Sequence, residues 1–368
     1  MESLILYGGT FDPIHNGHLR IARAASLTLN ADVIFVPNAN PPGKKPVANF
    51  SNRLEMLKHA LKEDGSASFS ISLFESELTD DPHYWIDTLR HFHARYPNRK
   101  LFFILGADEV NQFPSWKSPD EIRALATPIY IPRPGIEVQD KILERYGIRR
   151  LPYDKSGEVS SKGVRCLHSL DIPISVRNDI EKKHLYYIND ISTMLSAHRL
   201  LHSISVARLA YEIAYRNRLR EPRLAYIAGL LHDIGKDTPK ALESQMMAER
   251  YPKESHFPEW TYHQFTGAEI AKEKFGIEQE EVLDAIRCHA TGKPHMTRLA
   301  KIIYSSDKID PLRGYDSSKL IKACMKDCYQ GFIRVLEANK IYLEGKGYQI
   351  DNPMTDACMK LYLGGKAK

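Results

Sequence analysis

Short apolar runs divide the first half of the chain and alternate with stretches whose apolar residues recur at helical spacing. Brief apolar runs between polar segments are typical of strands that are buried on both faces. Four such runs are expected to form strands: Leu4–Tyr7, Val33–Val36, Leu101–Leu105 and Pro128–Ile131. Helices are expected from about Leu19 and from about Asn52. The alternation predicts an α/β fold with a doubly wound parallel sheet.

From about residue 190 the pattern changes to helical spacing almost throughout. The clearest series is Leu201, Ser205, Leu209 and Ile213. A polar stretch that begins at Asn189 precedes the first long helix and offers Ser or Thr as its N-cap, so we place a domain boundary there. The sequence therefore predicts an α/β domain at residues 1–188 and an all-α domain at residues 189–368.

Composition narrows the kind of partner. The chain has 368 residues, enough for two domains, and its hydrophobic content of 43 % is ordinary for a globular protein. Its 51 basic and 46 acidic residues are mixed, without the clustered basic face that a nucleic-acid binder needs. No apolar run is long enough for a membrane span, and the five cysteines include no C-x-x-C pair. We expect a cytoplasmic protein that binds small molecules, not nucleic acid or a membrane; a homo-oligomer is left open.

The segment Gly8–Leu19 follows the first predicted strand directly and runs into a helix. Gly8 and Gly9 leave the backbone open to a ligand, and the free amides of a helix N-terminus point at an anion placed there. His15 and His18 are three residues apart, so both can offer ring N–H donors to one side of that position. This combination predicts a phosphate site; the alternative is a glycine turn with two packed histidines.

Six imidazole and carboxylate side chains in the second half lie on otherwise apolar helix faces or next to apolar residues. They are His202, His232, Asp233, His263, His289 and Asp307. Any one of them alone is more typical of a hydrogen-bonded core residue. Burying all six without a shared ligand is costly, so the set predicts a metal site.

The glycine- and histidine-rich segment resembles the nucleotidyltransferases with a His-x-Gly-His signature. Its opening, Gly-Gly-Thr-Phe-Asp-Pro, is similar to that of the bacterial nicotinate mononucleotide adenylyltransferases, and five later segments extend the resemblance over residues 1–188. These segments are PNANPPGKK, YWIDTL, FILGADEVNQFPSW, IPRPG and SSKGVR. The resemblance implies adenylyl transfer from ATP, carried with Mg²⁺, to nicotinate mononucleotide, with deamido-NAD and pyrophosphate as products.

The same resemblance implies roles for individual residues. The groups that act on the triphosphate during transfer would be His15, His18, Lys44 and Arg165. The ATP-binding set would be Gly8, Gly9, Thr10, His15, His18, Gly106, Asp108, Ser160, Ser161 and Arg165, with Asp108 on the ribose. The pyridine-nucleotide set would be Tyr84, Trp85, Thr88, Trp116, Lys117 and Arg133, with Trp116 stacked on the pyridine ring.

The chain departs from that family at three positions: Gly43 replaces a usual His, Trp85 a small hydroxyl residue, and Lys162 a Thr. The change at Trp85 leaves the choice between the acid and the amide substrate open. Nicotinamide mononucleotide is therefore the alternative acceptor.

The adjacent His232 and Asp233 in AGLLHDIGKD resemble the HD phosphohydrolase superfamily, and AIRCHATGKPHMTRLAKIIYSSDKIDPLR is similar to the bacterial HD-domain hydrolases that split diadenosine tetraphosphate symmetrically. That family carries two iron ions, and the six residues match its ligand positions, with Asp233 bridging. Fe, with Mn as the alternative, is implied, and Asp233 would be essential for hydrolysis to two ADP. Lys236 is next to this site in the sequence and would serve the polyphosphate; a solvated surface lysine is the equal alternative. A non-catalytic, metal-binding regulatory domain is the alternative function.

Overall fold

The structure is a computed structural model. It describes residues 2–41, 45–78, 84–133, 135–153, 159–348 and 351–364. Its contacts divide the chain into two compact units, Met1–Tyr186 and Tyr187–Lys368.

The first unit is built on a parallel sheet of six strands in the order β3-β2-β1-β4-β5-β6. The strands are β1 (Ser3–Gly9), β2 (Ala31–Pro37), β3 (Phe69–Ile71), β4 (Lys100–Gly106), β5 (Thr127–Ile131) and β6 (Arg149–Arg150). The four predicted strands lie within β1, β2, β4 and β5, and the predicted α/β fold is confirmed. β3 and β6 were not predicted because they span only three and two residues.

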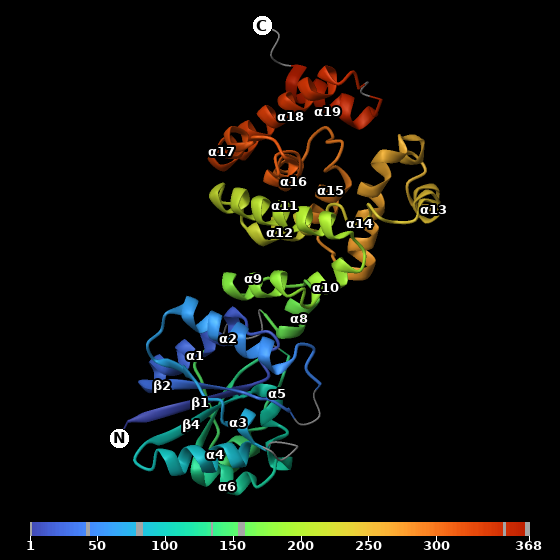
Figure 1. Ribbon diagram of the computed structural model, residues 1–368. Helices are drawn as coiled ribbons and strands as arrows, with labels where there is room; N and C mark the ends of the chain where they lie inside the picture. Colours follow the sequence, from blue (N-terminus) through green and yellow to red (C-terminus); the bar gives the residue numbers. More distant parts are fainter. Residues whose placement is uncertain are drawn as a thin grey trace. The chain divides into compact units, whose positions relative to one another are not determined.

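Helices cover both faces of this sheet, with α1 and α2 on one face and α4 and α6 on the other (Figure 1). The helices of the unit are α1 (Asn16–Leu29), α2 (Phe50–Asp64), α3 (Phe74–Glu77), α4 (Trp85–Arg95), α5 (Ala107–Val110), η1 (Phe113–Ser115), α6 (Pro119–Leu125), α7 (Asp140–Tyr146), α8 (Ser161–Arg165) and α9 (Ile174–Lys182). The strand order changes direction between β1 and β4: β2 and β3 lie on one side of this pair, and β5 and β6 lie on the other. Folds of this kind bind ligands in the crevice at the carboxyl ends of the two strands where the order changes direction.

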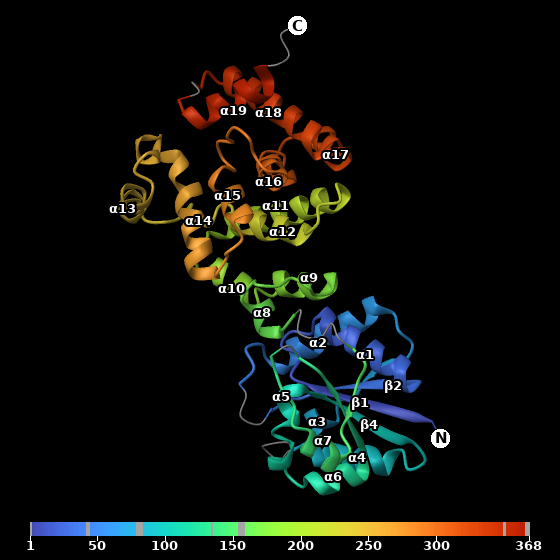
Figure 2. The ribbon, with the colours of Figure 1, turned by 180° about the vertical axis from the view of Figure 1, so that it is seen from behind.

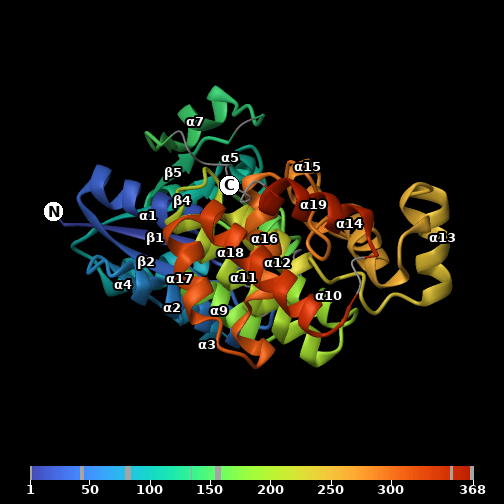
Figure 3. The same cartoon turned by 90° about the horizontal axis from the view of Figure 1, so that it is seen from above.

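The second unit is helical throughout its described residues, as the spacing predicts. Its helices are α10 (Tyr187–Ser192), α11 (Ala197–Arg216), α12 (Pro222–Leu231), α13 (Lys240–Arg250), η2 (Glu254–His256), η3 (Glu259–Thr261), α14 (Tyr262–Phe275), α15 (Glu280–Arg287), α16 (Arg298–Lys308), η4 (Pro311–Arg313), α17 (Ser318–Lys326), α18 (Cys328–Gly345) and α19 (Pro353–Leu363). Helices α11, α12 and α16 pack together in the middle of the unit (Figure 2), and α13 lies at its edge (Figure 3). None of the described helices combines the length and apolar character that a membrane span requires.

Two glycines bring the helices of the second unit unusually close. A Cβ on Gly229 of α12 would lie 2.8 Å from the Cα of Ala207 on α11. A Cβ on Gly235, just after α12, would lie 2.6 Å from the carbonyl oxygen of His263 on α14. Only glycine fits at these contacts, which draw the segment containing Asp233 against the neighbouring helices.

Candidate active sites

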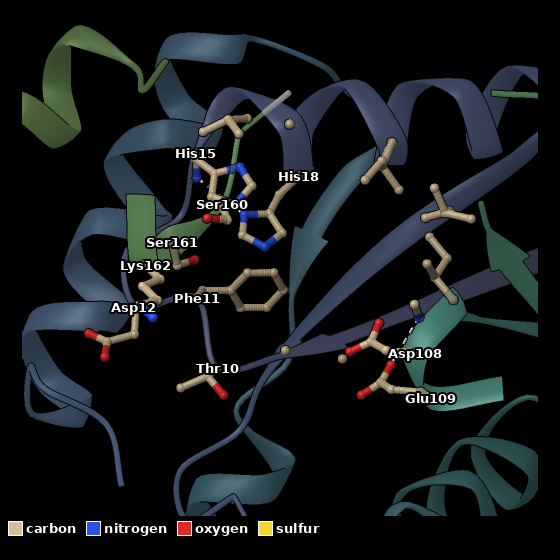
Figure 4. A pocket seen from close by; sticks show the side chains of 18 of the residues that line it. Thr10, Phe11, Asp12, His15, His18, Asp108, Glu109, Ser160, Ser161 and Lys162 are labelled. Carbon is tan, nitrogen blue, oxygen red and sulfur yellow. Dashed lines mark hydrogen bonds between the residues drawn. The ribbon is translucent and has the colours of Figure 1, made fainter. Parts of the chain in front are cut away.

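A cavity of about 800 Å³ opens at the carboxyl ends of β1 and β4 in the first unit (Figure 4). Its walls come from the β1–α1 turn, the β4–α5 turn, β5 and α8. The predicted nucleotide residues among its lining are Gly8, Gly9, Thr10, His15, His18, Gly106, Asp108, Arg133, Ser160, Ser161 and Arg165. The fold therefore gathers the whole predicted ATP-binding set around one hollow.

His15 and His18 lie at the N-terminus of α1 with their rings stacked, 3.6 Å between centroids. The backbone N–H of His15 donates to Nδ1 of His18 over 3.2 Å, so a neutral His18 carries its proton on Nε2. Burial lowers the pKa of His15 to about 3, and burial together with the neighbouring His15 holds the pKa of His18 well below its usual value. Both rings are therefore neutral at pH 7, and His18 has a free N–H for an anion.

Asp12, in the turn after β1, forms hydrogen bonds with segments of the first unit that are distant in the sequence. Its buried carboxylate accepts hydrogen bonds from the backbone N–H groups of Val47 at 2.7 Å and Ala48 at 3.1 Å. The hydroxyl of Tyr186 donates to the same carboxylate over 2.7 Å. Asp12 was not singled out from the sequence, and its structural partners lie 35 to 174 residues away along the chain.

Arg53 of α2 is the second unpredicted anchor, and only 1 % of it is exposed. One guanidinium nitrogen, Nη1, donates to the carbonyl oxygens of Thr10 at 2.6 Å and Asn38 at 2.8 Å. Arg53 therefore holds the loops after β1 and β2 in fixed positions. The sequence did contain a signal, because Arg53 is spaced with Met56, Leu57 and Ala60 on the buried face of its helix.

Helix α8 forms the wall next to the β1–α1 turn, beside the two histidines (Figure 4). The Ser160 side chain caps this helix by accepting from the Gly163 N–H at 3.0 Å, and the Ser161 hydroxyl donates to the Pro13 carbonyl at 2.9 Å. The Arg165 guanidinium donates to the carbonyl oxygen of Asp12 at 2.5 Å. These bonds hold two hydroxyls and one permanent cation on the same side of the cavity as the histidines. The predicted Lys44 lies outside the described residues.

The β4–α5 turn contributes Gly106 and Asp108 to a third wall. The Asp108 carboxylate accepts from Arg133 Nη1 over 2.9 Å, and both side chains are about half exposed. A Cβ at Gly106 would lie 2.5 Å from Asp108 Oδ1, so a side chain there would displace the Asp108 carboxylate from its present position. Arg133 was assigned to the pyridine nucleotide, and it lies here beside the residue assigned to the ribose.

The other five residues of the pyridine-nucleotide set do not line this cavity. They are Tyr84, Trp85, Thr88, Trp116 and Lys117. Trp85 lies at its border, because a Cβ on Gly8 would be 2.6 Å from the indole ring. Lys117 Nζ lies 4.4 Å from the centre of the Tyr84 ring, so these two residues are neighbours.

Thr88 and Trp116 also have contacts within the protein. The buried Thr88 hydroxyl donates to Glu75 Oε1 over 2.9 Å. The Trp116 ring packs on Phe113, with 5.3 Å between centroids.

The second unit brings all six predicted histidines and aspartates together around Asp233. Asp233 Oδ1 lies 3.3 Å from Nε2 of His289 and 3.5 Å from Nε2 of His263. On the other side, Asp233 Oδ2 lies 3.8 Å from Nε2 of His232. The ligand atoms form two overlapping groups, one of Asp233, His263 and His289 and one of His202, His232 and Asp233. A carboxylate shared by two such groups suits a pair of metal ions.

The remaining predicted ligand, Asp307, completes the second group. Its Oδ1 lies 3.2 Å from Nε2 of His202 and 3.7 Å from Nε2 of His232. Lys308 Nζ approaches its other oxygen at 2.9 Å, and the Arg313 guanidinium donates to Oδ1. Lys308 thus compensates the buried carboxylate at Oδ2, and Arg313 compensates it at Oδ1, the oxygen that the two histidines approach.

The four histidines are oriented by bonds at Nδ1. Three of them place Nδ1 on carbonyl oxygens, those of Gly229, Trp260 and Ile286, at 2.7 to 2.8 Å. A carbonyl only accepts, so each of these Nδ1 atoms carries a proton and the Nε2 lone pair faces the group. His232 Nε2 is buried without a hydrogen-bond partner in the described structure. These residues fit a metal ion, which would supply the missing partner.

His202 is oriented by a carboxylate that the sequence reasoning missed. Asp310 Oδ2 lies 2.6 Å from His202 Nδ1, and the Ser205 hydroxyl donates to Asp310 Oδ1 at 2.5 Å. Burial lowers the pKa of His202, but the hydrogen bonds to Asp307 and Asp310 outweigh it and raise the value to about 9. The signal was the spacing of Asp307 and Asp310, one turn apart at the end of α16.

Residues 6–167 match the cytidylyltransferase-like family, and residues 199–312 match the HD domain family. The HD match and the ligand clusters together assign divalent-metal binding to the second unit.

A Mycoplasma genitalium protein described as a "probable nicotinate-nucleotide adenylyltransferase/Ap4A hydrolase" is 30 % identical over 346 residues, which cover 91 % of this chain and 97 % of that protein. The Bacillus subtilis nicotinate-nucleotide adenylyltransferase is 40 % identical over 142 residues, which cover 38 % of this chain and 74 % of that protein. A Clostridium acetobutylicum crystal structure described as an "HD superfamily hydrolase involved in NAD metabolism" covers 48 % of this chain and 95 % of its own, at 28 % identity and a TM-score of 0.43. Both resemblances seen in the sequence are thus confirmed, and the chain belongs to the family that joins a nicotinate-nucleotide adenylyltransferase to an Ap4A hydrolase.

Proposed function

We propose that the first unit transfers the adenylyl group of ATP to nicotinate mononucleotide, giving deamido-NAD and pyrophosphate. The observation that carries this proposal is the pair of stacked, neutral histidines at the N-terminus of α1 inside the cavity. Neutral N–H donors and helix amides bind a polyphosphate without needing a general base. In-line attack by the acceptor phosphate on the α-phosphorus then requires only positioning and charge stabilisation.

In this proposal His18 Nε2–H and the α1 amides hold the phosphate oxygens on which charge develops. Arg165 and the hydroxyls of Ser160 and Ser161, which lie beside the histidines, also hold the triphosphate, and Asp108 takes the ribose. Mg²⁺ arrives with ATP and neutralises the departing pyrophosphate. Lys44 would add a further cation to the triphosphate.

The pyridine end of the acceptor is proposed to lie at the Trp85 border of the cavity. Arg133 would face the nucleotide there, and Trp116 the ring, with Tyr84, Thr88 and Lys117 around them. Comparing nicotinate and nicotinamide mononucleotide in a pyrophosphate-release assay tests the acceptor. At least tenfold higher kcat/KM for the acid is expected; equal rates would contradict the assignment.

For the second unit we propose metal-dependent hydrolysis of diadenosine tetraphosphate to two ADP. The observation that carries this proposal is the convergence of four imidazoles on both sides of Asp233. Imidazole and carboxylate ligands suit Fe or Mn, which when bound would activate water and neutralise phosphate oxygens. Lys236, with Nζ 3.9 Å from Asp233 Oδ1, would hold an oxygen of the polyphosphate.

Metal analysis of the purified protein, followed by chromatography of the products from diadenosine tetraphosphate, tests this second activity. Two equivalents of metal and two ADP per substrate are expected. AMP and ATP would mean asymmetric cleavage, and a metal-loaded but inactive protein would favour a regulatory domain.

A further inference from the structure

A second cavity, of about 550 Å³, opens over the metal-ligand cluster of the helical unit. His202 and Asp233 form part of its wall, together with the cationic side chains of Lys236 and Arg313. A space of this volume is in the range of sites that enclose one small ligand, such as a single nucleotide. It is therefore sized for one half of a symmetrical dinucleotide.

The other part of the wall is apolar. Leu201 of α11 and Leu312 of η4 both line the cavity, and 59 % and 57 % of these side chains are exposed. Each is adjacent in sequence to a polar residue of the same wall, Leu201 to His202 and Leu312 to Arg313. One exposed leucine is ordinary on a protein surface, but two in the wall of one cavity form an apolar surface beside a charged one.

The cationic side is arranged around the metal ligands. Lys236 Nζ lies 3.1 Å from Nε2 of His263, and the Arg313 guanidinium is bonded to Asp307. His198 and Arg199 extend the basic rim, with Arg199 also paired to Asp237 at 2.9 Å. A nucleotide combines the same two characters, because its base is flat and largely apolar on both faces while its phosphates are anionic.

We infer that Leu201 and Leu312 form the base-binding surface of the hydrolase site, and that they seat the purine of one nucleotide while Lys236 and Arg313 face its phosphates. This inference rests on the proposed hydrolase function. The leucines would act on substrate affinity through the base and would leave the metal ions untouched. If the leucines bind the base, affinity for the nucleotide should fall when the apolar surface is removed. Affinity should be kept when a leucine is replaced by an aromatic residue.

The test measures inhibition constants on the full chain with bis(4-nitrophenyl) phosphate as the reporter substrate, so it does not depend on the natural substrate. ADP and inorganic tripolyphosphate serve as inhibitors, since only ADP carries a base. In Leu312→Ser we expect the inhibition constant of ADP to rise about tenfold and that of tripolyphosphate to stay within about twofold. Leu201→Ser should behave alike, and Leu312→Phe should keep the wild-type value.

Leu361→Ser is the matched control, because Leu361 is exposed on α19 of the same unit and does not line the cavity. Metal content should be equal in all variants. Unchanged ADP inhibition in both serine variants, or an equal rise for ADP and tripolyphosphate, would overturn the inference. A wild-type protein that turns over the reporter but not diadenosine tetraphosphate would instead reject the proposed function, whatever the leucine variants do.

Discussion

The two sites of this chain use histidine in opposite directions. In the first unit, His18 Nδ1 accepts a backbone N–H, so Nε2 is left as a donor, which suits an anion. In the second unit, His232, His263 and His289 place Nδ1 on carbonyl oxygens, so Nε2 is left as a lone pair, which suits a cation. The partner at Nδ1 therefore decides whether an imidazole binds a phosphate or a metal.

Buried carboxyl groups of the two units also differ, in the direction in which their pKa values are shifted. Burial raises the pKa of Asp307, but the ammonium of Lys308 and the hydrogen bond with His202 hold it well below its usual value. Glu75 of the first unit is equally buried but has the Thr88 hydroxyl as its hydrogen-bond donor, and burial raises its pKa to about 7. Burial alone does not determine the charge of such a group; its neighbours do.

The largest effect is expected from Asp233→Ala, which removes the carboxylate shared by both ligand groups. Metal content and hydrolysis should fall below detection, because neither group keeps its common ligand. Adenylyl transfer should stay within about twofold, since the two sites lie in separate units. Metal analysis, ADP formation and pyrophosphate release measure the three properties.

Asp237→Ala is the matched control for that variant, because Asp237 is four residues away and pairs with Arg199. It should keep its metal. Loss of adenylyl transfer in Asp233→Ala would show that the two sites are coupled.

The next effect is expected at His18. Replacing His18 by Ala removes a donor to the developing charge, so kcat should fall about 10²-fold while the KM for ATP changes little. His18→Gln, whose amide also donates near the Nε2 position, should recover part of the loss. An unchanged turnover number in His18→Ala would contradict the proposed role.

The same substitution sharpens the contrast at the other site. His232→Gln replaces the imidazole by an amide, whose nitrogen has no lone pair for a metal and whose oxygen is a weaker ligand for Fe, so metal binding and hydrolysis should fall together. Metal retention in this variant would break the comparison between the two sites.

A smaller effect is expected from Asp310→Ala. This carboxylate orients His202 but does not face the ligand group, so metal affinity should fall by about 10- to 100-fold rather than vanish. Competition with a calibrated chelator measures it. Ser205 donates to Asp310 and not to His202, so Ser205→Ala should lower metal affinity less than Asp310→Ala does. An equal loss of metal affinity in both variants would point to a general packing defect.

The smallest effect concerns Glu75→Gln and the pH dependence of stability. Because the folded-state pKa is raised to about 7 from 4.5, the native protein binds the proton more tightly, and stability falls as pH rises between these values. At pH 8 the variant should be more stable than wild type by about 3 kcal/mol of unfolding free energy, and it should therefore unfold at a higher temperature. The two should coincide near pH 4.5.

Thermal unfolding followed by tryptophan fluorescence measures this difference, because Trp85 and Trp116 report on the first unit. A constant difference across the pH range would mean that Glu75 is ionised throughout.

Much of the fold was readable along the chain. The apolar runs in β1, β2, β4 and β5 and the helical spacing after residue 190 follow from local periodicity, which burial on a sheet or a helix face imposes directly. The short strands β3 and β6 could not be predicted, because two or three residues are too few to show an alternation of apolar and polar positions.

The site residues also fall into those that local sequence could predict and those that it could not. Gly8, His15 and His232 belong to motifs whose members are close in sequence, so their types and spacing already indicate an anion site and a metal site. Asp12 and Arg53 belong to no such motif, because they form hydrogen bonds with carbonyl, amide and hydroxyl groups that are distant in the sequence.

The sequence by itself determined which groups could bind a phosphate or a metal, since donor chemistry is a property of the residue. Only the tertiary structure decided in which direction each group acts, because the proton on an imidazole follows the partner that packing places at Nδ1. It likewise decided which aspartate lies between two sets of histidines and which only supports one of them. Those partners come from helices distant in the chain, and no local pattern records the contact.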